Sequence, residues 1–326
     1  MSTPLLQVRD LKVHFKPPRR GFGKAPAAIR AVDGVSFDVE AGQTLGLVGE
    51  SGCGKSTTAR AVLNLIRNAH REGEVILDGT QIDHLGEAAM RPYRAKAQMV
   101  FQDPFASLNP RMTVGKIIRE PMRNFGLGLS DQDEQLEVIR LMELVGINPR
   151  YMNRYPHEFS GGQRQRIGIA RALAVQPQLI VCDEAVSALD VSIQAQVINL
   201  LMDLQQKLGV AYVFISHDLA VIGEISDRIL VMYLGRIVES GHADDVIDNP
   251  LHPYTRALLK SIPKIDQPIE SLEPIEGSIP SPFEVQAGCP FYSRCTERVG
   301  DICLNQKPQR KTYKNAHTVN CHLHAL

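Results

Sequence analysis

Residues 49–56 read GESGCGKS, a combination of residue types and spacing that could bind a polyphosphate. They match the phosphate-loop pattern G-x-x-x-x-G-K-[ST]; the apolar run 45–48 before them and the helix-compatible residues after them supply the strand and helix that this motif requires. Because glycines let backbone N–H groups turn toward one point at a helix N-terminus, the main chain can hold phosphate there. We predict that Lys55 reaches the β- and γ-phosphates and that Ser56 ligates Mg²⁺.

Three further apolar runs end in polar side chains. Residues 178–184 (QLIVCDE) predict a strand that ends at Asp183 and Glu184, which could serve Mg²⁺ and the attacking water, respectively. Gln102 follows the run at 98–101 in the same way, and His217 follows the run at 211–215. A histidine alone is more often structural, but polar side chains at the carboxyl ends of strands are well placed for a ligand, and this favours a functional His217.

A second glycine-containing helix start lies at residues 159–173, FSGGQRQRIGIARAL. Ser160, Gly161 and Gly162 offer a second place where backbone N–H groups could meet phosphate. The chain therefore carries two candidate phosphate-binding loops.

Composition limits the classes of protein to which the chain can belong. Of its 326 residues 44% are apolar, and the 36 Lys and Arg balance the 36 Asp and Glu, so no global charge indicates a nucleic-acid or membrane-surface partner. We expect a cytosolic globular protein, because neither a signal peptide nor a membrane-spanning run is recognisable. The six cysteines should then be free thiols or metal ligands.

The rest of the chain predicts the elements that position these loops. Alternating apolar residues predict strands at 6–15 and 35–39, and an Asp-Gly turn closes another at 73–79. Residues 111–158 have helical character, with Ser130 as an N-cap. Residues 16–29 are rich in Pro, Gly and basic residues, which predicts an exposed loop.

Taken together, the motifs resemble the ATP-binding subunits of ABC transporters. GESGCGKS, Gln102, FSGGQ, LIVCDE, SALD (187–190) and His217 follow one another in the family's order, and the likeness covers residues 1–250. It implies an α/β fold: a phosphate-loop ATPase core with an antiparallel β subdomain and a helical subdomain at about 103–165. It also implies an irregular, Cys-containing C-terminal extension at 251–326.

The resemblance assigns roles residue by residue. Phe15 would stack on adenine. Gln102 would sense the γ-phosphate, and together with Ser56 and Asp183 it would bind Mg²⁺. Glu184 would be the general base, and His217 would be the switch histidine. Asp190, the last residue of SALD (187–190), would be the D-loop aspartate. The residues that would hold ATP in the phosphate loop are Gly49, Glu50, Ser51, Gly52, Cys53, Gly54, Lys55, Ser56 and Thr57. Those that would contact the γ-phosphate of ATP bound to the other subunit are Ser160, Gly161, Gly162 and Gln163. One departure is Ala185 where the family usually has proline, which could leave Glu184 slightly looser.

Longer stretches narrow the resemblance to the subunits of oligopeptide and dipeptide importers: residues 101–111, 153–173 and 249–263, and the tail. This implies a second ATP-binding subunit, a related and non-identical chain, two transmembrane permeases, and indirectly an extracytoplasmic peptide-binding protein, with no nucleic acid. The chain would lie peripherally on the cytoplasmic face of the bacterial inner membrane. Phe105, Leu108 and Arg111 are exposed candidates for receiving a permease helix, and ordinary core packing is the alternative. The competing functions are a soluble ABC-type ATPase acting on nucleic acid or the ribosome, and a catalytically degenerate subunit.

The extension has its own composition. Six prolines between 262 and 290 predict an irregular segment, and Cys289, Cys295, Cys303 and Cys321 follow at spacings unlike those of common zinc modules. We predict a 4Fe-4S cluster on these four thiols, to which the subfamily resemblance also points. Zinc, with His317, His322 or His324 as substitute ligands, and unligated cysteines stay open.

Overall fold

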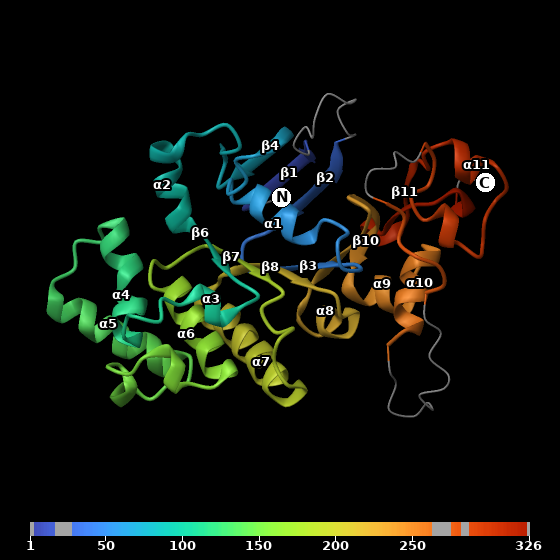
Figure 1. Ribbon diagram of the computed structural model, residues 1–326. Coiled ribbons are helices and arrows are strands. Elements are labelled where there is room, and N and C mark those ends of the chain that lie inside the picture. Colours follow the sequence, from blue (N-terminus) through green and yellow to red (C-terminus); the bar gives the residue numbers. More distant parts are fainter. Residues whose placement is uncertain (1–2, 17–27, 263–274, 282–286, 325–326) are drawn as a thin grey trace, which may run out of the picture. The chain divides into compact units, whose positions relative to one another are not determined.

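The computed structural model describes residues 3–16, 28–262, 275–281 and 287–324 (Figure 1). The chain divides into two compact units, the first formed by residues 1–5, 39–43 and 77–215 and the second by residues 6–38, 44–76 and 216–326. Most of the predicted loop at 16–29 and much of the proline-rich segment lie outside the described residues. The predicted domain boundaries, at residue 250 and at about 103–165, stay predictions.

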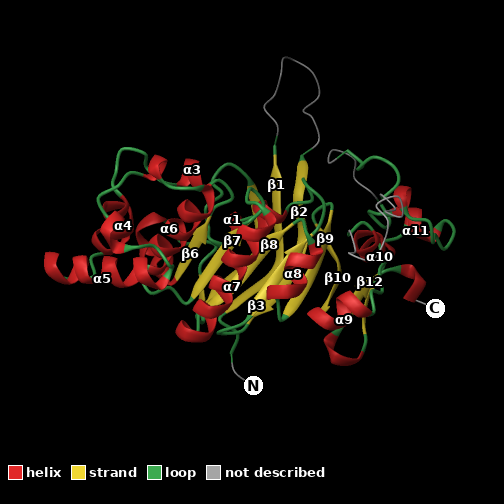
Figure 2. Cartoon of the chain, turned by 90° about the horizontal axis from the view of Figure 1, so that it is seen from below, coloured by secondary structure: helices red, strands yellow, loops and turns green. Residues whose placement is uncertain are grey.

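Three parallel strands form the sheet of the first unit (Figure 2). They are β6 (Ala97–Val100), β7 (Leu179–Asp183) and β8 (Ala211–Ser216), and the short β5 (Thr80–Gln81) also belongs to this unit. Nearly every residue of β6, β7 and β8 is buried, which explains why they read as apolar runs rather than as alternating patterns. Because parallel strands place their carboxyl ends at the same end of a sheet, Gln102 after β6 and Glu184 after β7 lie close together.

Six helices belong to the same unit: α2 (Glu87–Lys96), α3 (Pro104–Ser107), α4 (Val114–Phe125), α5 (Asp131–Leu144), α6 (Gly161–Leu173) and α7 (Val191–Leu208). Figure 1 shows α3, α4, α5 and α6 as a green cluster, and α6 contacts each of the other three. Ser130 caps α5 as predicted, since its hydroxyl accepts from the Asp133 N–H at 3.2 Å.

The second unit contains mostly strands. They are β1 (Leu6–Phe15), β2 (Ile29–Val39), β3 (Thr44–Val48), β4 (His70–Leu77), β9 (Arg228–Tyr233), β10 (Arg236–His242), β11 (Arg310–Thr312) and β12 (Thr318–Asn320). β3 pairs in parallel with β9, and β9 pairs antiparallel with β10. Its helices are α1 (Lys55–Val62), α8 (Leu219–Ile225), α9 (Ala243–Asp248), α10 (Pro253–Lys260) and α11 (Ile302–Asn305). The predicted fold class, an α/β protein with parallel and antiparallel pairs, is confirmed.

The C-terminal extension is more regular than the sequence predicted. β12 pairs antiparallel with β10, and β11 pairs with β12, so the tail adds two strands to the sheet edge. Glu239 on β10 is fully buried; its carboxylate contacts His317 Nε2 at 2.8 Å and accepts the Leu251 and His252 N–H groups at 2.7 and 2.8 Å. The extension is therefore anchored through a buried carboxylate as well as by strand pairing.

Candidate active site and family assignment

Lys55, the first residue of α1, is buried against the phosphate loop. Its ammonium donates to the carbonyls of Gly49 at 2.7 Å and Glu50 at 3.1 Å. Gly54, the N-cap of α1, has φ +108°, and a Cβ there would lie 2.1 Å from the Ala31 carbonyl oxygen. The loop thus takes the shape that the sequence predicted, and glycine is required at position 54 by both backbone conformation and space.

The other residues of the loop differ in exposure, and their predicted contacts with phosphate stay predictions. Ser51 and Gly52 are exposed, and Ser56 and Thr57 are half-buried in the first turn of α1, whose N–H groups have no partner within the helix. Cys53 is buried, and burial raises the pKa of its thiol, so it stays protonated near neutral pH.

In the first unit, the structure brings Gln102 and Glu184 together. The Gln102 amide donates to the Glu184 carboxylate at 2.7 Å, and Asp183 is the buried last residue of β7. Glu184 has φ +49°, a conformation that is costly for a residue with a Cβ and that recurs at functional sites. Hydrogen bonds hold it there: its N–H donates to the Ile215 carbonyl at 3.1 Å, and its carbonyl accepts from the Ser187 hydroxyl at 3.0 Å. The looser placement of Glu184 that Ala185 suggested stays a prediction.

In the FSGGQ segment, Ser160 and Gln163 form a capping box at the N-terminus of α6. The Ser160 hydroxyl accepts from the Gln163 N–H at 3.3 Å, and the Gln163 side chain accepts from the Ser160 N–H at 3.0 Å. A Cβ on Gly162 would lie 2.3 Å from Ile193 Cγ2 on α7, which begins after its N-cap Asp190. Glycine at 162 therefore allows α6 and α7 to approach closely.

Two more predicted residues lie in the second unit. His217 is exposed directly after β8, and the next residue, Asp218, caps α8. Phe15 is the half-buried last residue of β1. Their predicted contacts with nucleotide remain predictions. Two residues that no motif indicated, Tyr254 and Arg294, contact the phosphate loop at Glu50.

Comparison with known proteins decides the family. Residues 32–187 match the family model described as ABC transporter, and residues 238–303 match the one described as oligopeptide/dipeptide transporter, C-terminal region. The chain is 50% identical to the oligopeptide transport ATP-binding protein OppF of Escherichia coli over 97% of its own length and 95% of the relative's.

The chain belongs to the ABC transporter family.

Other comparisons agree with this assignment. The chain is 48% identical to the oligopeptide transport ATP-binding protein AppF of Bacillus subtilis over 98% of both chains. Among solved structures, it is similar to a dimeric ATP-binding cassette in a post-hydrolysis state bound to ADP and Pi, with a TM-score of 0.64 and 25% identity, over 73% of this chain and 98% of the other. In the described parts of this ABC transporter chain, no helix is long and apolar enough to cross a membrane.

The predicted permease-facing residues divide into two kinds. Phe105 is 63% exposed, with the Arg164 guanidinium 3.5 Å from its ring centre, and Arg111 is exposed as well. Leu108 is 1% exposed, so the prediction that it lies on the surface was wrong. It follows α3 in a short extended segment and belongs to the core, as the alternative interpretation had it.

All six cysteines of this ABC transporter chain are free and buried. Burial raises the pKa of Cys289 to about 12, and the thiols of Cys321, Cys295 and Cys303 also raise it. The Cys289 N–H donates to the Cys303 carbonyl at 2.8 Å, so these two residues are in contact. No group of three or more His, Cys, Asp or Glu side chains in the described residues is arranged to hold a metal ion. The predicted metal centre is therefore not visible as a preformed site for a single ion.

Proposed function

We propose that the chain is the ATP-hydrolysing subunit of a peptide importer, coupling ATP binding and hydrolysis to the movement of membrane permeases. The observation that carries this proposal is the 50% identity to an oligopeptide transport ATP-binding protein over nearly the whole of both chains, including the C-terminal region. The geometry of the phosphate loop and of Gln102 and Glu184 supports an active enzyme.

In this mechanism each part of the chain has a chemical role. The phosphate loop and Lys55 bind the triphosphate of ATP, and Phe15 stacks on its adenine. Ser56, Gln102 and Asp183 would hold Mg²⁺, which neutralises charge on the β- and γ-phosphates. Glu184 takes a proton from the attacking water, and the hydrogen bond from Gln102 orients its carboxylate. His217 is the switch histidine near the γ-phosphate.

We further propose that the ATP site is completed by a second ATP-binding subunit. The helix start at Ser160 to Gln163, followed by Asp190, would contact ATP on the partner, a related but non-identical chain. A dimeric cassette bound to ADP and Pi has the same fold, which supports a paired arrangement. ATP then draws the subunits together, and loss of the γ-phosphate lets them part.

We also propose the remaining partners, which similarity to oligopeptide transport ATP-binding proteins supports. Two transmembrane permeases would contact the surface around Phe105 and Arg111, and an extracytoplasmic peptide-binding protein would deliver the substrate. The chain would lie on the cytoplasmic face of the bacterial inner membrane without crossing it. The alternative function, a soluble ABC-type ATPase acting on nucleic acid or the ribosome, is disfavoured by the match to a transporter-specific C-terminal region and by the balanced charge.

The test is peptide uptake by the assembled transporter. The chain, its partner ATPase and the permeases are reconstituted in vesicles, and ATP-dependent uptake of a labelled peptide is measured with wild type and with Lys55→Ala. We expect uptake from wild type and its loss in the variant, because the variant has no cation at the phosphates. A complex that transports equally well with Lys55→Ala, or a chain that copurifies with ribosomes instead of permeases, would contradict the proposal.

We also propose that Cys289, Cys295, Cys303 and Cys321 hold a 4Fe-4S cluster. Four free, buried thiols in the extension support this, because four cysteines are the usual ligand set of such a cluster. The cluster would order the extension. Anaerobic purification followed by iron and sulfide analysis should give four of each per chain; stoichiometric zinc, or no metal, would rule the cluster out.

A further inference from the structure

Glu50, the second residue of the phosphate loop, is held by an arginine of the C-terminal extension. Arg294 Nη1 lies 2.6 Å from Glu50 Oε2, and Arg294 Nη2 lies 3.0 Å from Glu50 Oε1, which is the bidentate geometry of a strong ion pair. The Arg294 side chain is 4% exposed and that of Glu50 is 23% exposed. Arg294 belongs to a short 3₁₀ turn, Tyr292–Arg294, that directly precedes Cys295.

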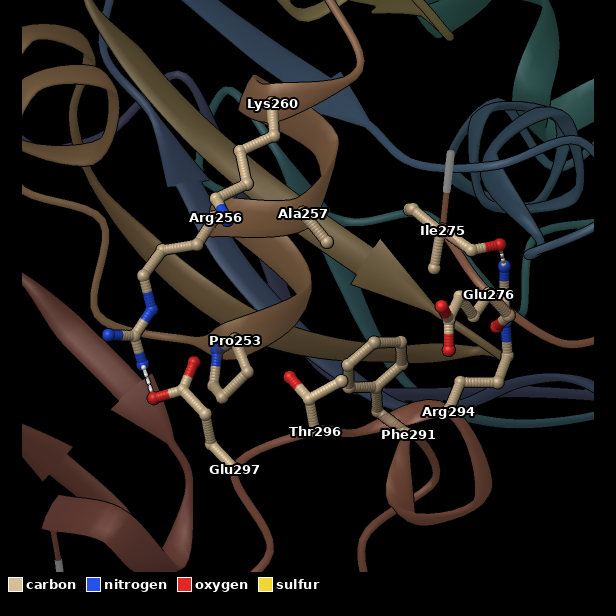
Figure 3. A pocket seen from close by; sticks show the side chains of 10 residues that line it. All are labelled: Pro253, Arg256, Ala257, Lys260, Ile275, Glu276, Phe291, Arg294, Thr296 and Glu297. Atoms are coloured by element: carbon tan, nitrogen blue, oxygen red, sulfur yellow. Dashed lines mark hydrogen bonds and ion pairs between the residues drawn. The ribbon is translucent and has the colours of Figure 1, made fainter. Parts of the chain in front are cut away.

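The extension also fixes Arg294 itself. Its Nε donates to the Glu276 carbonyl at 3.1 Å, its Nη2 to the Ile275 carbonyl at 3.3 Å, and its Nη1 to the Tyr233 hydroxyl at 3.4 Å. Figure 3 shows the guanidinium beside Ile275 and Glu276 at one side of a pocket of about 480 Å³, and the Arg256–Glu297 ion pair at the other. Because the guanidinium already donates to two carbonyls of the extension and to the Tyr233 hydroxyl on β9, contacts other than Glu50 also position Arg294.

A second contact holds the main chain of the same residue. The Glu50 N–H donates to the Tyr254 hydroxyl at 2.8 Å, and Tyr254 is fully buried with its ring 4.7 Å from that of Tyr233 and 5.3 Å from that of Phe291. The Glu50 carbonyl accepts from Lys55 at 3.1 Å. Glu50 therefore connects the extension to the lysine expected to bind the phosphates.

The charges explain why such a connection matters. A carboxylate in a loop that binds a triphosphate repels the ligand unless a cation neutralises it and holds it aside. Arg294 does both, because its planar guanidinium makes two hydrogen bonds to the carboxylate. The guanidinium is buried, so water weakens the attraction between the two charges only slightly.

We propose that Arg294 is a positioning residue for ATP: by pairing with Glu50 it lets the C-terminal extension set the shape and charge of the phosphate loop of its own chain. This inference rests on the proposed function, because it assumes that the loop binds ATP. It assigns the extension a direct part in nucleotide affinity.

The test is a double-mutant cycle on nucleotide affinity, measured by titration of the purified full-length chain with a fluorescent ATP analogue. We expect Arg294→Ala to weaken binding about tenfold, since Glu50 is left as an unpaired anion beside the phosphates. Glu50→Gln in the Arg294→Ala background should recover much of that loss, because no charge is then left unpaired. The loss should be larger for the ATP analogue than for the ADP analogue, because ATP carries the additional charge.

Glu297→Gln is the matched control, since it removes a carboxylate from the same pocket without contact with the loop; its affinity should equal that of wild type. Arg294→Lys keeps the positive charge but cannot make the bidentate contact, so ATP affinity should fall several-fold. This variant replaces Arg294→Ala in the test if Arg294→Ala shows no folding transition on heating. Wild-type affinity in both Arg294 variants, or losses that simply add in the double variant, would overturn the inference. A wild-type chain that binds no ATP analogue would instead refute the proposed function.

Discussion

Glu184, the proposed general base, has a strained backbone conformation. Glu184 is held at φ +49° by backbone hydrogen bonds and accepts a hydrogen bond from Gln102, although that glutamine is 82 positions away in the sequence. Its place at the end of an apolar strand was predictable from the sequence, because a buried strand followed by two carboxylates is a local pattern. Its backbone conformation and its partner were not, since both depend on contacts between segments distant in the chain.

The residue-scale prediction concerns Glu184→Gln. The substitution keeps the shape and the hydrogen-bonding capacity of the side chain but removes the base, so ATP hydrolysis should fall by about 10² to 10⁴-fold while ATP binding is retained. Glu143→Gln makes the same change on an exposed position of α5 and should leave turnover unaltered. Steady-state phosphate release and nucleotide titration measure the two quantities, and near-normal turnover by Glu184→Gln would refute its assignment as the base.

At the scale of elements, the sequence predicted what is local and missed what is not. Alternation and apolar runs predicted β1, β6, β7 and β8 and the 35–39 half of β2, which begins at Ile29, and Ser130 predicted the start of α5. The pairing of β12 with β10 was not predicted, because three residues carry too short a pattern and the pairing depends on Glu239, Ser240 and Thr318 meeting across the sequence. The C-terminal elements are held by such distant contacts.

The element-scale prediction concerns His252, the N-cap of α10. Its Nδ1 accepts from the Tyr254 N–H at 3.0 Å, and burial, with the nearby charges of Arg256 and His324, lowers its pKa to about 3. The folded state therefore keeps His252 neutral, while the unfolded chain takes up a proton below pH of about 6.5. The contribution of His252 to the free energy of unfolding is fully present above that pH. It is lost by about 1.4 kcal/mol per pH unit as pH falls toward 3.

His252→Asn keeps a capping acceptor but does not titrate. The free energy of unfolding, measured by urea denaturation between pH 7 and pH 5, should fall less steeply for this variant than for wild type. Since Glu239, His317 and His324 are unchanged in the variant, the difference isolates His252. Identical pH dependence of the two proteins would show that His252 is not kept neutral.

At the scale of the whole molecule, the sequence motifs identified the family, and the comparisons confirmed it. The motifs could not predict that the C-terminal extension contacts the phosphate loop. Glu50 and Arg294 are 244 positions apart, and no sequence motif includes both of them. The extension was predicted from its prolines, its cysteines and the subfamily resemblance. The structure adds that it also holds the loop proposed to bind ATP.

If two subunits complete each ATP site, the rate of ATP hydrolysis per mole of this chain depends on the partner ATPase, and it is measured as that partner is added. The chain alone should hydrolyse ATP poorly at low concentration, and its specific activity should rise steeply with partner until the two are equimolar. Ser160→Arg should abolish the hydrolysis contributed by the partner's site while this chain still binds ATP, because its own phosphate loop is intact. Full specific activity of the chain alone, unchanged by dilution or by partner, would show that a second subunit does not complete the ATP site.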